Sequence, residues 1–405
     1  MTTIPTDVTA ALPALADLYR DLHANPELSF QEHRTAAVVV RTLGDAWDVT
    51  PGVGGTGVVA VLRNGEGPTV WMRADMDALP VREETGLAYA STVTTEDGIP
   101  VMHACGHDMH VTCLLGACAQ LAVSRGSWSG TVVALFQPAE EVGGGARGML
   151  DDGLLERFPR PDVVLGQHVS PGAAGRVSHC PGTILAASDT IDIRLHGQGG
   201  HGSQPEHTVD PVVMAASLVM RLQTVVSRTV GPMEQAVVTV GRLQAGTKEN
   251  VIPDAAELGV NIRSFDEGVR ARVIGAVERL TRAEAQGAGA PREPEILPRQ
   301  SFPVTVNDVA ATERVMAAHT AALGEGSVRT MGPATGSEDF GLFGTEAEVP
   351  SVFWMFGGGD PAGWGPDGPL GPIHPNHSPR FAPVVEPTIE SGVRALLIAA
   401  GVWLT

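Results

Sequence analysis

The sequence predicts a two-domain α/β protein in which a larger mixed-sheet domain is interrupted by a smaller α+β domain. Apolar strand segments alternate with helical segments before residue 188 and again after residue 298, as in an α/β sheet covered on both faces. Between these parts the predicted order becomes strand, helix, strand, strand, helix, which is typical of a ferredoxin-like domain. We therefore expect residues 1–187 and 299–405 to form one domain and residues 188–298 an inserted one.

Length and composition exclude several classes of protein. A chain of 405 residues suits two domains with buried cores, and 43% hydrophobic with 18% charged residues exclude disordered, collagen-like and coiled-coil chains. The formal net charge of −19 gives no electrostatic basis for binding nucleic acid or an anionic membrane.

No segment resembles a membrane anchor, a secretory signal or a disulfide framework. No run reaches the ~18 uncharged apolar residues of a membrane span, and the N-terminus lacks the basic start and apolar block of a signal peptide. Four cysteines are too few for a disulfide-stabilised fold. We therefore expect a cytoplasmic protein.

The larger domain is predicted to begin with two helices, over residues 10–22 and 30–43. A strand pair follows, with the turn Asn64-Gly65-Glu66-Gly67 between strands over 57–63 and 69–73. Further apolar runs predict buried strands over 131–136, 162–165 and 352–356.

The inserted domain is predicted to contain strands over 190–195, 236–243 and 256–263 and helices over 211–228 and 267–285. The first of these helices has the clearest start signal, because Asp210 can cap it and Pro211 suits its first position. The glycine- and proline-rich segment 287–298 then leads back to the larger domain.

Side chains that bind metals are concentrated in His103-Ala104-Cys105-Gly106-His107-Asp108. A thiolate, an imidazole and a carboxylate this close together suit a zinc-like divalent ion. A polar loop with a buried cysteine is the alternative explanation.

Two adjacent carboxylates, Glu140 and Glu141, follow the predicted strand over 131–136. Open α/β sheets bind ligands outside the carboxyl ends of their strands. Adjacent glutamates usually lie on a solvated helix, but Pro138 and the three glycines 143–145 favour a tight loop. Because neighbouring side chains diverge, one carboxylate can bind a metal while the other handles a proton.

Further polar residues follow other strands: Asp75 and Asp77, His168, and near the C-terminus His374 and His377. Any one of them alone is more often a capping or surface residue. Their repeated occurrence at strand ends favours a shared site. Cysteine, histidine and glutamate ligands from these segments would suffice for two metal ions that share one bridging ligand and leave positions open for water.

The inserted domain carries three further candidates. His201 lies in the glycine-rich loop 197–203, Asn250 in the segment 244–253, and Arg263 closes a predicted strand. An arginine at a strand end can bind a carboxylate with two hydrogen bonds, although a surface salt bridge is the alternative.

Six motifs occur in the order RADMDALP (73–80), MHACGHD (102–108), QPAEE (137–141), GGHGS (199–203), SEDF (337–340) and HSPRF (377–381). Together they resemble the metal-dependent amidohydrolase family that holds aminoacylases, hippurate hydrolases and indole-3-acetyl-amino-acid hydrolases. The resemblance covers nearly the whole chain. Within the family, the chain is most similar to bacterial N-acyl-amino-acid aminoacylases of the acylglutamine type.

This resemblance implies a zinc-peptidase-like catalytic domain with two divalent metal ions per subunit. Zinc is the expected metal, with manganese, cobalt or nickel as alternatives. Cys105 is implied to bridge the metals, Glu140 to act as general base, and Asp77 to orient a ligand imidazole. The other implied ligands are His107, Glu141, His168 and His377, the last of these preferred to His374.

The resemblance also implies that the inserted domain serves as a lid and dimerisation domain. His201 would stabilise the tetrahedral oxyanion from a partner subunit, while Asn250 and Arg263 would hold the carboxylate of the substrate. A homodimer with lid closure is therefore expected.

The implied reaction is hydrolysis of an N-acyl amino acid by a metal-activated water molecule. A dipeptidase, a carbamoyl-amino-acid hydrolase and an N-acetyl-diaminopimelate deacetylase are alternatives on the same scaffold. A catalytically inactive metal-binding protein is the non-enzyme alternative, although an intact Glu140 weighs against it, because a protein that only holds metal needs no base.

Overall fold

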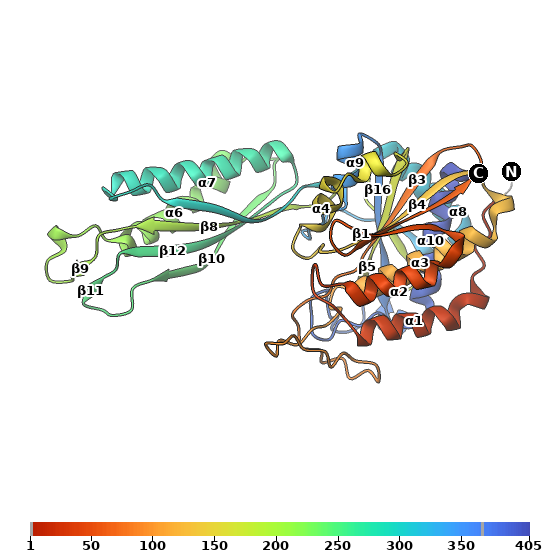
Figure 1. Cartoon of the computed structure of the whole chain (residues 1–405). Helices are drawn as coiled ribbons and strands as arrows, with labels where there is room; N and C mark the ends of the chain where they lie inside the picture. The colour runs from red at the N-terminus through yellow and green to blue at the C-terminus, as the bar shows by residue number, and fades with distance from the viewer. Residues whose placement is uncertain (1–2, 366–367) are drawn as a thin grey trace. The chain divides into compact units, whose positions relative to one another are not determined.

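The computed structural model describes residues 3–365 and 368–405, which form two compact units (Figure 1). The first unit comprises the chain up to Ile184 together with Val306–Gly332 and Asp339–Thr405, and the second comprises Leu185–Thr305 and Pro333–Glu338. The second unit contains the expected insertion over 188–298 and continues beyond it, because strand β13 (Glu295–Phe302) runs across residue 298.

An eight-stranded mixed sheet forms the centre of the first unit, in the order β1-β2-β4-β3-β5-β16-β6-β15. Strands β3, β4, β5 and β16 are parallel to one another, so their carboxyl ends meet at one edge. The strands are β1 (Asp48–Val53), β2 (Gly57–Asn64), β3 (Thr69–Asp75), β4 (Gly130–Gln137), β5 (Val163–Ala173), β6 (Val177–His179), β15 (Val328–Thr330) and β16 (Ser351–Gly359).

The predicted pairing of β2 with β3 is wrong. Strand β4 lies between them, antiparallel to β2 and parallel to β3. All residues of β4 except Thr131 are buried, and a central position gives both edges of this apolar strand a hydrogen-bonding neighbour. The turn at 64–67 therefore joins two strands that are not adjacent.

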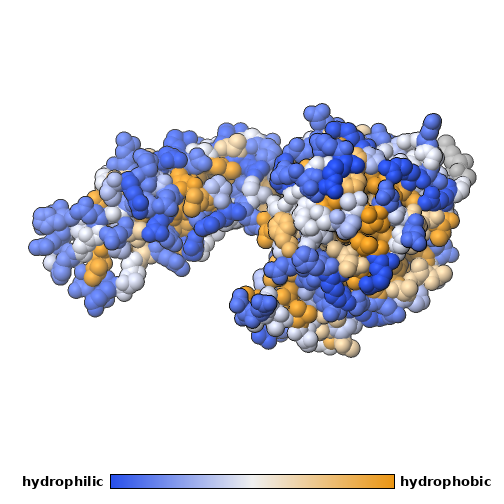
Figure 2. Space-filling view, viewed as in Figure 1, coloured by the Kyte–Doolittle hydropathy of each residue, from blue (hydrophilic) through white to orange (hydrophobic). Residues whose placement is uncertain are grey.

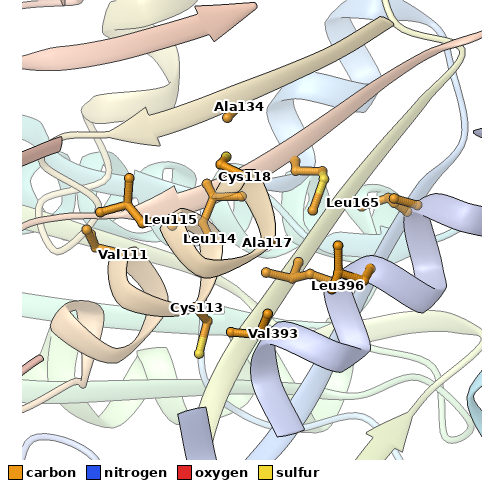
Figure 3. Packing of buried hydrophobic residues seen from close by; sticks show 14 of the residues in the cluster. Val111, Cys113, Leu114, Leu115, Ala117, Cys118, Ala134, Leu165, Val393 and Leu396 are labelled. Carbon is orange, nitrogen blue, oxygen red and sulfur yellow. The ribbon is translucent and has the colours of Figure 1, made fainter. Parts of the chain in front are cut away.

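Helices α3 (His107–Val123) and α10 (Val385–Leu404) pack together against one face of this sheet. In Figure 3 the apolar side chains of α3 meet β4, β5 and α10; the labelled residues include Leu114, Cys118, Ala134, Leu165, Val393 and Leu396. Helix α3 is buried from His107 to Cys118, as expected for a helix between a sheet and other helices. The other helices of this unit are α1 (Leu12–Ala24), α2 (His33–Leu43), α4 (Gly145–Asp151), α5 (Leu154–Arg157), α8 (Val309–Leu323) and α9 (Gly341–Ala347).

The second unit has the ferredoxin-like order expected from the sequence. Its antiparallel sheet is ordered β10-β12-β8-β13, and its chain order is β8-α6-β10-β12-α7-β13. Helix α6 begins where expected, because the Asp210 side chain accepts a hydrogen bond from the N–H of Val212 at 2.8 Å. The remaining bounds are β8 (Ala187–His196), α6 (Pro211–Thr229), β10 (Ala236–Ala245), β12 (Ala255–Ser264) and α7 (Glu267–Gly287).

Short strand pairs are also present among the described residues: β7 (Gly182–Leu185) with β14 (Thr305–Asn307), β9 (Gly200–His201) with β11 (Val251–Ile252), and β17 (Trp364–Gly365) with β18 (Gly368–Pro369). In the part of the chain that the structure describes, no helix is both long and apolar enough to cross a membrane. The visible surface of each unit is mostly hydrophilic, with scattered hydrophobic residues (Figure 2).

Two buried histidines connect β6, α8 and α10. The Nε2–H of His319 donates to the carbonyl oxygen of Ala395 at 2.9 Å, so its Nδ1 accepts the Nε2–H of His179, also at 2.9 Å. Burial lowers the pKa of His179 to about 3 and that of His319 to about 4. Both imidazoles are therefore neutral in the folded protein near pH 7.

We expect the free energy of unfolding to decrease as the pH falls from 6.5, the ordinary histidine pKa, towards the lowered values of this pair. The unfolded chain takes up protons first in this range, at up to ~1.4 kcal/mol per pH unit for each proton. Denaturant unfolding of the wild type and of a His179→Gln/His319→Gln variant between pH 4 and 8 measures how much this histidine pair contributes to the pH dependence of the free energy of unfolding. Equal pH slopes in the two proteins would contradict it.

Candidate metal centre

The carboxyl ends of three parallel strands supply most of the candidate site. Asp75 ends β3, and Glu140 and Glu141 follow β4. His168 lies within β5, which continues to Ala173, eight residues beyond its predicted end at 165. His107 starts α3. The first unit therefore brings segments far apart in the sequence to one sheet edge, as expected from the strand-end pattern.

Asp77 holds several of these segments together. Its Oδ1 accepts hydrogen bonds from Nδ1 of His107 at 3.2 Å and from the backbone N–H of Glu140 at 3.1 Å. Its Oδ2 accepts from the N–H of Glu141 at 3.0 Å and from the hydroxyl of Ser29 at 2.7 Å. The carboxylate thus orients one imidazole and fixes the backbone of both glutamates.

A strained residue directly precedes Glu140. Ala139 has a positive φ of 50°, which is unfavourable for a residue with a Cβ. The buried carboxylate of Glu32 holds this conformation, because it accepts the N–H of Ala139 at 2.8 Å and is itself bonded by the hydroxyl of Thr56. The turn that presents Glu140 and Glu141 therefore depends on a residue more than a hundred positions earlier.

The loop that carries Cys105 and His107 turns at Gly106. This glycine has a φ of 84°, and a Cβ at this position would lie 2.5 Å from Cγ1 of Val169. The side-chain amide of Asn376 donates to the carbonyl oxygen of Cys105 at 3.1 Å, and the N–H of His377 donates to that of Ala104 at 2.8 Å. The C-terminal segment is thereby attached to the loop.

The potential ligand atoms of the described residues form four groups, two of which meet at Glu141. The other two groups are Asp75, His107, His110 and His168, and Glu140, Glu338 and Asp339. Atoms of Cys105, Glu141 and His377 lie within 4.8 Å of one another, and so do atoms of His107, Glu140 and Glu141. The Sγ of Cys105 is also 3.4 Å from Nε2 of His168. All five ligands expected from the sequence are therefore close together, with Glu140 beside them.

The hydrogen bonds of the imidazoles fit metal binding. His168 donates its Nδ1–H to the carbonyl oxygen of Val169 at 2.7 Å, which leaves the lone pair of Nε2 directed at Cys105. His107 uses Nδ1 for Asp77, and its buried Nε2 has no hydrogen-bond partner within residues 3–365 and 368–405. A buried nitrogen without a partner, beside sulfur and carboxylate donors, fits a metal ligand.

The charges around these atoms favour a cation. Burial raises the pKa of the Cys105 thiol well above its usual range, and the carboxylates of Glu141 and Glu140 raise it further. Burial disfavours the charged form of His107, but the charge of Asp75 and the hydrogen bond to Asp77 outweigh this effect and raise its pKa to about 10. A divalent cation competes with these protons, so metal affinity should decrease at low pH.

His377, and not His374, lies in this cluster. Nε2 of His377 is 3.5 Å from Oε1 of Glu141. His374 instead lines a cavity of about 280 Å³ together with Trp364 and Phe381. The structure thus favours His377 among the two alternatives.

The other candidates belong to the second unit. His201 and Asn250 lie together, because the N–H of Gly202 donates to the carbonyl oxygen of Asn250 at 2.9 Å and His201 pairs with Val251. Both side chains are exposed. Nδ1 of His201 is 2.7 Å from the hydroxyl of Ser203.

Arg263 does not join His201 and Asn250. It lies near the end of β12, eight residues from Ala255, which corresponds to about 26 Å along a strand. Its guanidinium donates to the hydroxyl of Ser337 at 2.8 Å and to the carbonyl oxygen of Thr335 at 3.2 Å. The two groups therefore occupy opposite ends of the inserted sheet.

His110 and the role of Asp75 were not predicted from the sequence. Both are buried, and Nδ1 of His110 donates to Oδ1 of Asp75. Asp75 also accepts from Nη1 of the buried Arg73 at 2.7 Å. A signal was present, since a second histidine follows His107 by three residues on the same helix and therefore shares its face.

This fold and site are those of the class of metal-dependent amidohydrolases. They combine an inserted ferredoxin-like unit with thiol, imidazole and carboxylate groups clustered at parallel strand ends. The sequence model of peptidase family M20/M25/M40 matches residues 71–400, and the chain belongs to this family. The family, the fold class and the enzyme class expected from the sequence are thereby confirmed.

Curated relatives cover most of the chain. Thermostable carboxypeptidase 2 of Saccharolobus solfataricus is 35% identical over 392 residues, 95% of this chain and 94% of the relative. N-acetyl-L-cysteine deacetylase of Bacillus subtilis is 37% identical over 357 residues, 87% and 82% of the two chains. Hippurate hydrolase of Campylobacter jejuni is 38% identical over 326 residues, 80% and 82%.

Solved structures match the same architecture. A protein of methicillin-resistant Staphylococcus aureus superimposes with a TM-score of 0.88 at 32% identity and covers 98% of both chains. The YXEP protein of Bacillus subtilis, a dinuclear metal-binding peptidase of family M20, superimposes with a TM-score of 0.78 at 30% identity, covering 97% of this chain and 98% of its own. These likenesses, with the ligand cluster, give this chain a candidate dinuclear metal site.

Replacing Asp77 by Asn should weaken metal binding by ~10–100-fold, the usual effect of losing a residue that orients a metal ligand. The amide nitrogen of the asparagine would place an N–H donor against groups that now donate hydrogen bonds to the Asp77 carboxylate. Titration of metal-free protein against a competing chelator measures this affinity. The exposed Asp45→Asn variant is the matched control, and equal affinities of the two variants would refute the role of Asp77.

Proposed function

We propose that the chain hydrolyses the amide bond of N-acyl amino acids, with Glu140 as the general base. The proposal depends above all on one observation: the candidate ligand Glu141 is adjacent to a second, buried carboxylate within the same cluster. A protein that only holds metal does not need this second carboxylate. The names of the deacetylase and hippurate hydrolase relatives support the substrate class.

Two divalent ions would be held by Cys105, His107, Glu141, His168 and His377. Among these residues, Cys105 lies beside both His168 and the Glu141–His377 pair. When bound, such ions supply the Lewis acidity that lowers the pKa of water and polarises an amide carbonyl. Sulfur, nitrogen and carboxylate donors suit zinc first, with manganese, cobalt or nickel as alternatives. All four cysteines are free thiols, which supports our proposal of a cytoplasmic location.

The proposed task of Glu140 is proton transfer. Its backbone N–H is bonded to Asp77, and its carboxylate lies within 4.8 Å of ligand atoms of His107 and Glu141. From this position it takes a proton from the attacking water and returns it to the leaving amine. Arg263 is proposed to bind the carboxylate of the substrate in its own subunit. Because Asn250 lies beside His201 at the other end of the inserted unit, it is proposed to reach the same carboxylate from a partner subunit.

Hydrolysis of short peptides is the second candidate function. The relatedness to a thermostable carboxypeptidase over nearly the whole chain favours it. Both substrate classes present an amide next to a free carboxylate, and they differ only in the group that occupies the acyl side.

Amine release from a panel of substrates tests the proposal. The panel contains N-acetyl and N-benzoyl amino acids, dipeptides, carbamoyl amino acids and N-acetyl-diaminopimelate, each with metal-free and metal-restored protein. We expect the fastest release from N-acyl amino acids, loss of activity on chelation, and recovery with zinc or manganese. Faster cleavage of dipeptides would favour the second candidate.

Glu140→Gln in the same assay should lower kcat by ~10²–10⁴ and leave the metal content unchanged. Glu141→Gln is the matched control, which should lose metal as well as activity. Stoichiometric metal binding by the wild type without cleavage of any amide would instead indicate a metal-binding protein without catalysis.

We further propose a homodimer formed through the inserted unit. Strand β10 is an edge strand of its sheet, and exposed hydrophobic side chains occur on it and on the neighbouring helix α6: Val237, Leu243, Val212, Val213 and Met220. An open edge with apolar neighbours favours pairing with a second copy about a two-fold axis. In such a dimer His201 would stabilise the oxyanion in the site of the partner.

Mixing of subunits tests this arrangement. His201→Ala and Glu140→Gln should each be nearly inactive alone. After co-refolding, activity should recover, because a mixed dimer contains one site with an intact Glu140 and a His201 from the other subunit. Absence of recovery, although mixed dimers are detected by mass, would show that His201 acts in its own subunit.

A further inference from the structure

A buried histidine that the proposed reaction does not use lies directly behind the ligand cluster. Nε2 of His110 accepts a hydrogen bond from the backbone N–H of Val169 at 2.7 Å. Because a backbone N–H can only donate, the proton of His110 is on Nδ1, which donates to Asp75. Both ring nitrogens are therefore occupied in a single neutral tautomer.

The same Val169 residue controls the tautomer of His168. Its carbonyl oxygen accepts the Nδ1–H of His168 at 2.7 Å and a side-chain N–H of Asn376 at 3.1 Å. A carbonyl oxygen can only accept, so the proton of His168 is on Nδ1 and Nε2 presents its lone pair to Cys105. The N–H and the carbonyl oxygen of Val169 thus connect His110 with His168.

The other end of this chain of hydrogen bonds is fixed by charge. Asp75 accepts from the buried guanidinium of Arg73 at 2.7 Å, and Arg73 also donates to the side chain of Gln137 at 2.7 Å. A carboxylate held by a buried arginine remains an acceptor and so keeps the Nδ1–H of His110 directed towards it. Arg73, Asp75, His110 and Val169 form a continuous support for His168.

We propose that His110 is a positioning residue for His168. It fixes the Val169 backbone so that the Val169 carbonyl keeps the proton of His168 on Nδ1 and Nε2 stays available to a metal ion shared with Cys105. The ring centroids of His110 and His168 are 4.5 Å apart at 71°, so His110 also limits the rotation of the His168 ring. This inference rests on the proposed function, because it takes His168 to be a ligand.

Two other roles for His110 give different expectations. As a direct ligand, it would need a lone pair, and its only lone pair is used by the N–H of Val169. As a mere core residue beside Phe356, it would be replaceable by any side chain of similar size. The positioning role instead requires an acceptor where Nε2 now lies.

A pair of amide variants separates these roles. In His110→Gln, the side-chain oxygen can lie near the present position of Nε2 and accept the N–H of Val169. In His110→Asn, the shorter side chain can still donate its amide N–H to Asp75, but it leaves the N–H of Val169 without an acceptor. Thermal unfolding of both variants and of the wild type records any general loss of stability.

The first readout is the tautomeric state, measured by nitrogen-15 NMR of the imidazoles in metal-free protein. We expect Nδ1–H tautomers for His110 and His168 in the wild type, with that of His168 retained in His110→Gln and lost in His110→Asn. A wild-type His168 with its proton on Nε2 would overturn the proposal without any variant being needed.

The second readout is the affinity for zinc, measured against a competing chelator. His110→Asn should weaken the binding of one of the two zinc ions by ~10–100-fold and leave the affinity for the other unchanged. The zinc affinities of His110→Gln should stay near those of the wild type. Equal affinities in all three proteins, or equal losses in both variants, would overturn the positioning role. Failure of the wild type to bind zinc, manganese, cobalt or nickel would refute the proposed function, whereas the tautomers would separately test whether His110 fixes the proton position of His168.

Discussion

The hydrogen bonds of Asp77 hold the site together. One carboxylate fixes His107, the backbone of both glutamates after β4, and the loop before α2. Because its two oxygens accept four hydrogen bonds in a buried environment, none of these groups can shift alone without leaving a polar atom unsatisfied. His107 begins α3, and the two glutamates lie in the short connection between β4 and α4. The shared acceptor therefore links segments that no common secondary structure joins.

Around Asp77 the protein buries more acidic than basic groups. Asp75, Asp77 and Glu140 are buried and Glu141 nearly so, whereas Arg73 is the buried guanidinium among them. Buried carboxylates are costly unless positive charge lies close to them, and a divalent cation would add such charge. Binding of metal ions at this cluster would therefore contribute to the free energy of folding as well as to the proposed chemistry.

The parts of the fold and of the site that could be predicted from the sequence are mostly those that depend on local patterns. The elements of the inserted unit follow from periodicity and the cap at Asp210. Cys105 and His107 follow from a closely spaced motif of metal-binding residues, and Glu140 and Glu141 from a motif at a strand end. The position of β4 between β2 and β3 depends on pairing between distant strands, which local patterns do not contain. Glu32 and His110 were missed for a similar reason: their partners, Ala139 and Val169, become neighbours only in the folded chain.

During biosynthesis, His377 is made much later than the other proposed ligands. Its segment comes after the whole inserted unit, 209 residues beyond His168 (377 − 168). At ~5–20 residues per second, the ribosome needs roughly 10–40 s to make this interval. During that time a nascent chain can present Cys105, His107, Glu141 and His168 without the last proposed ligand. With this set of proposed ligands, full coordination would be a late step of maturation, and chains that terminate early would have an incomplete site.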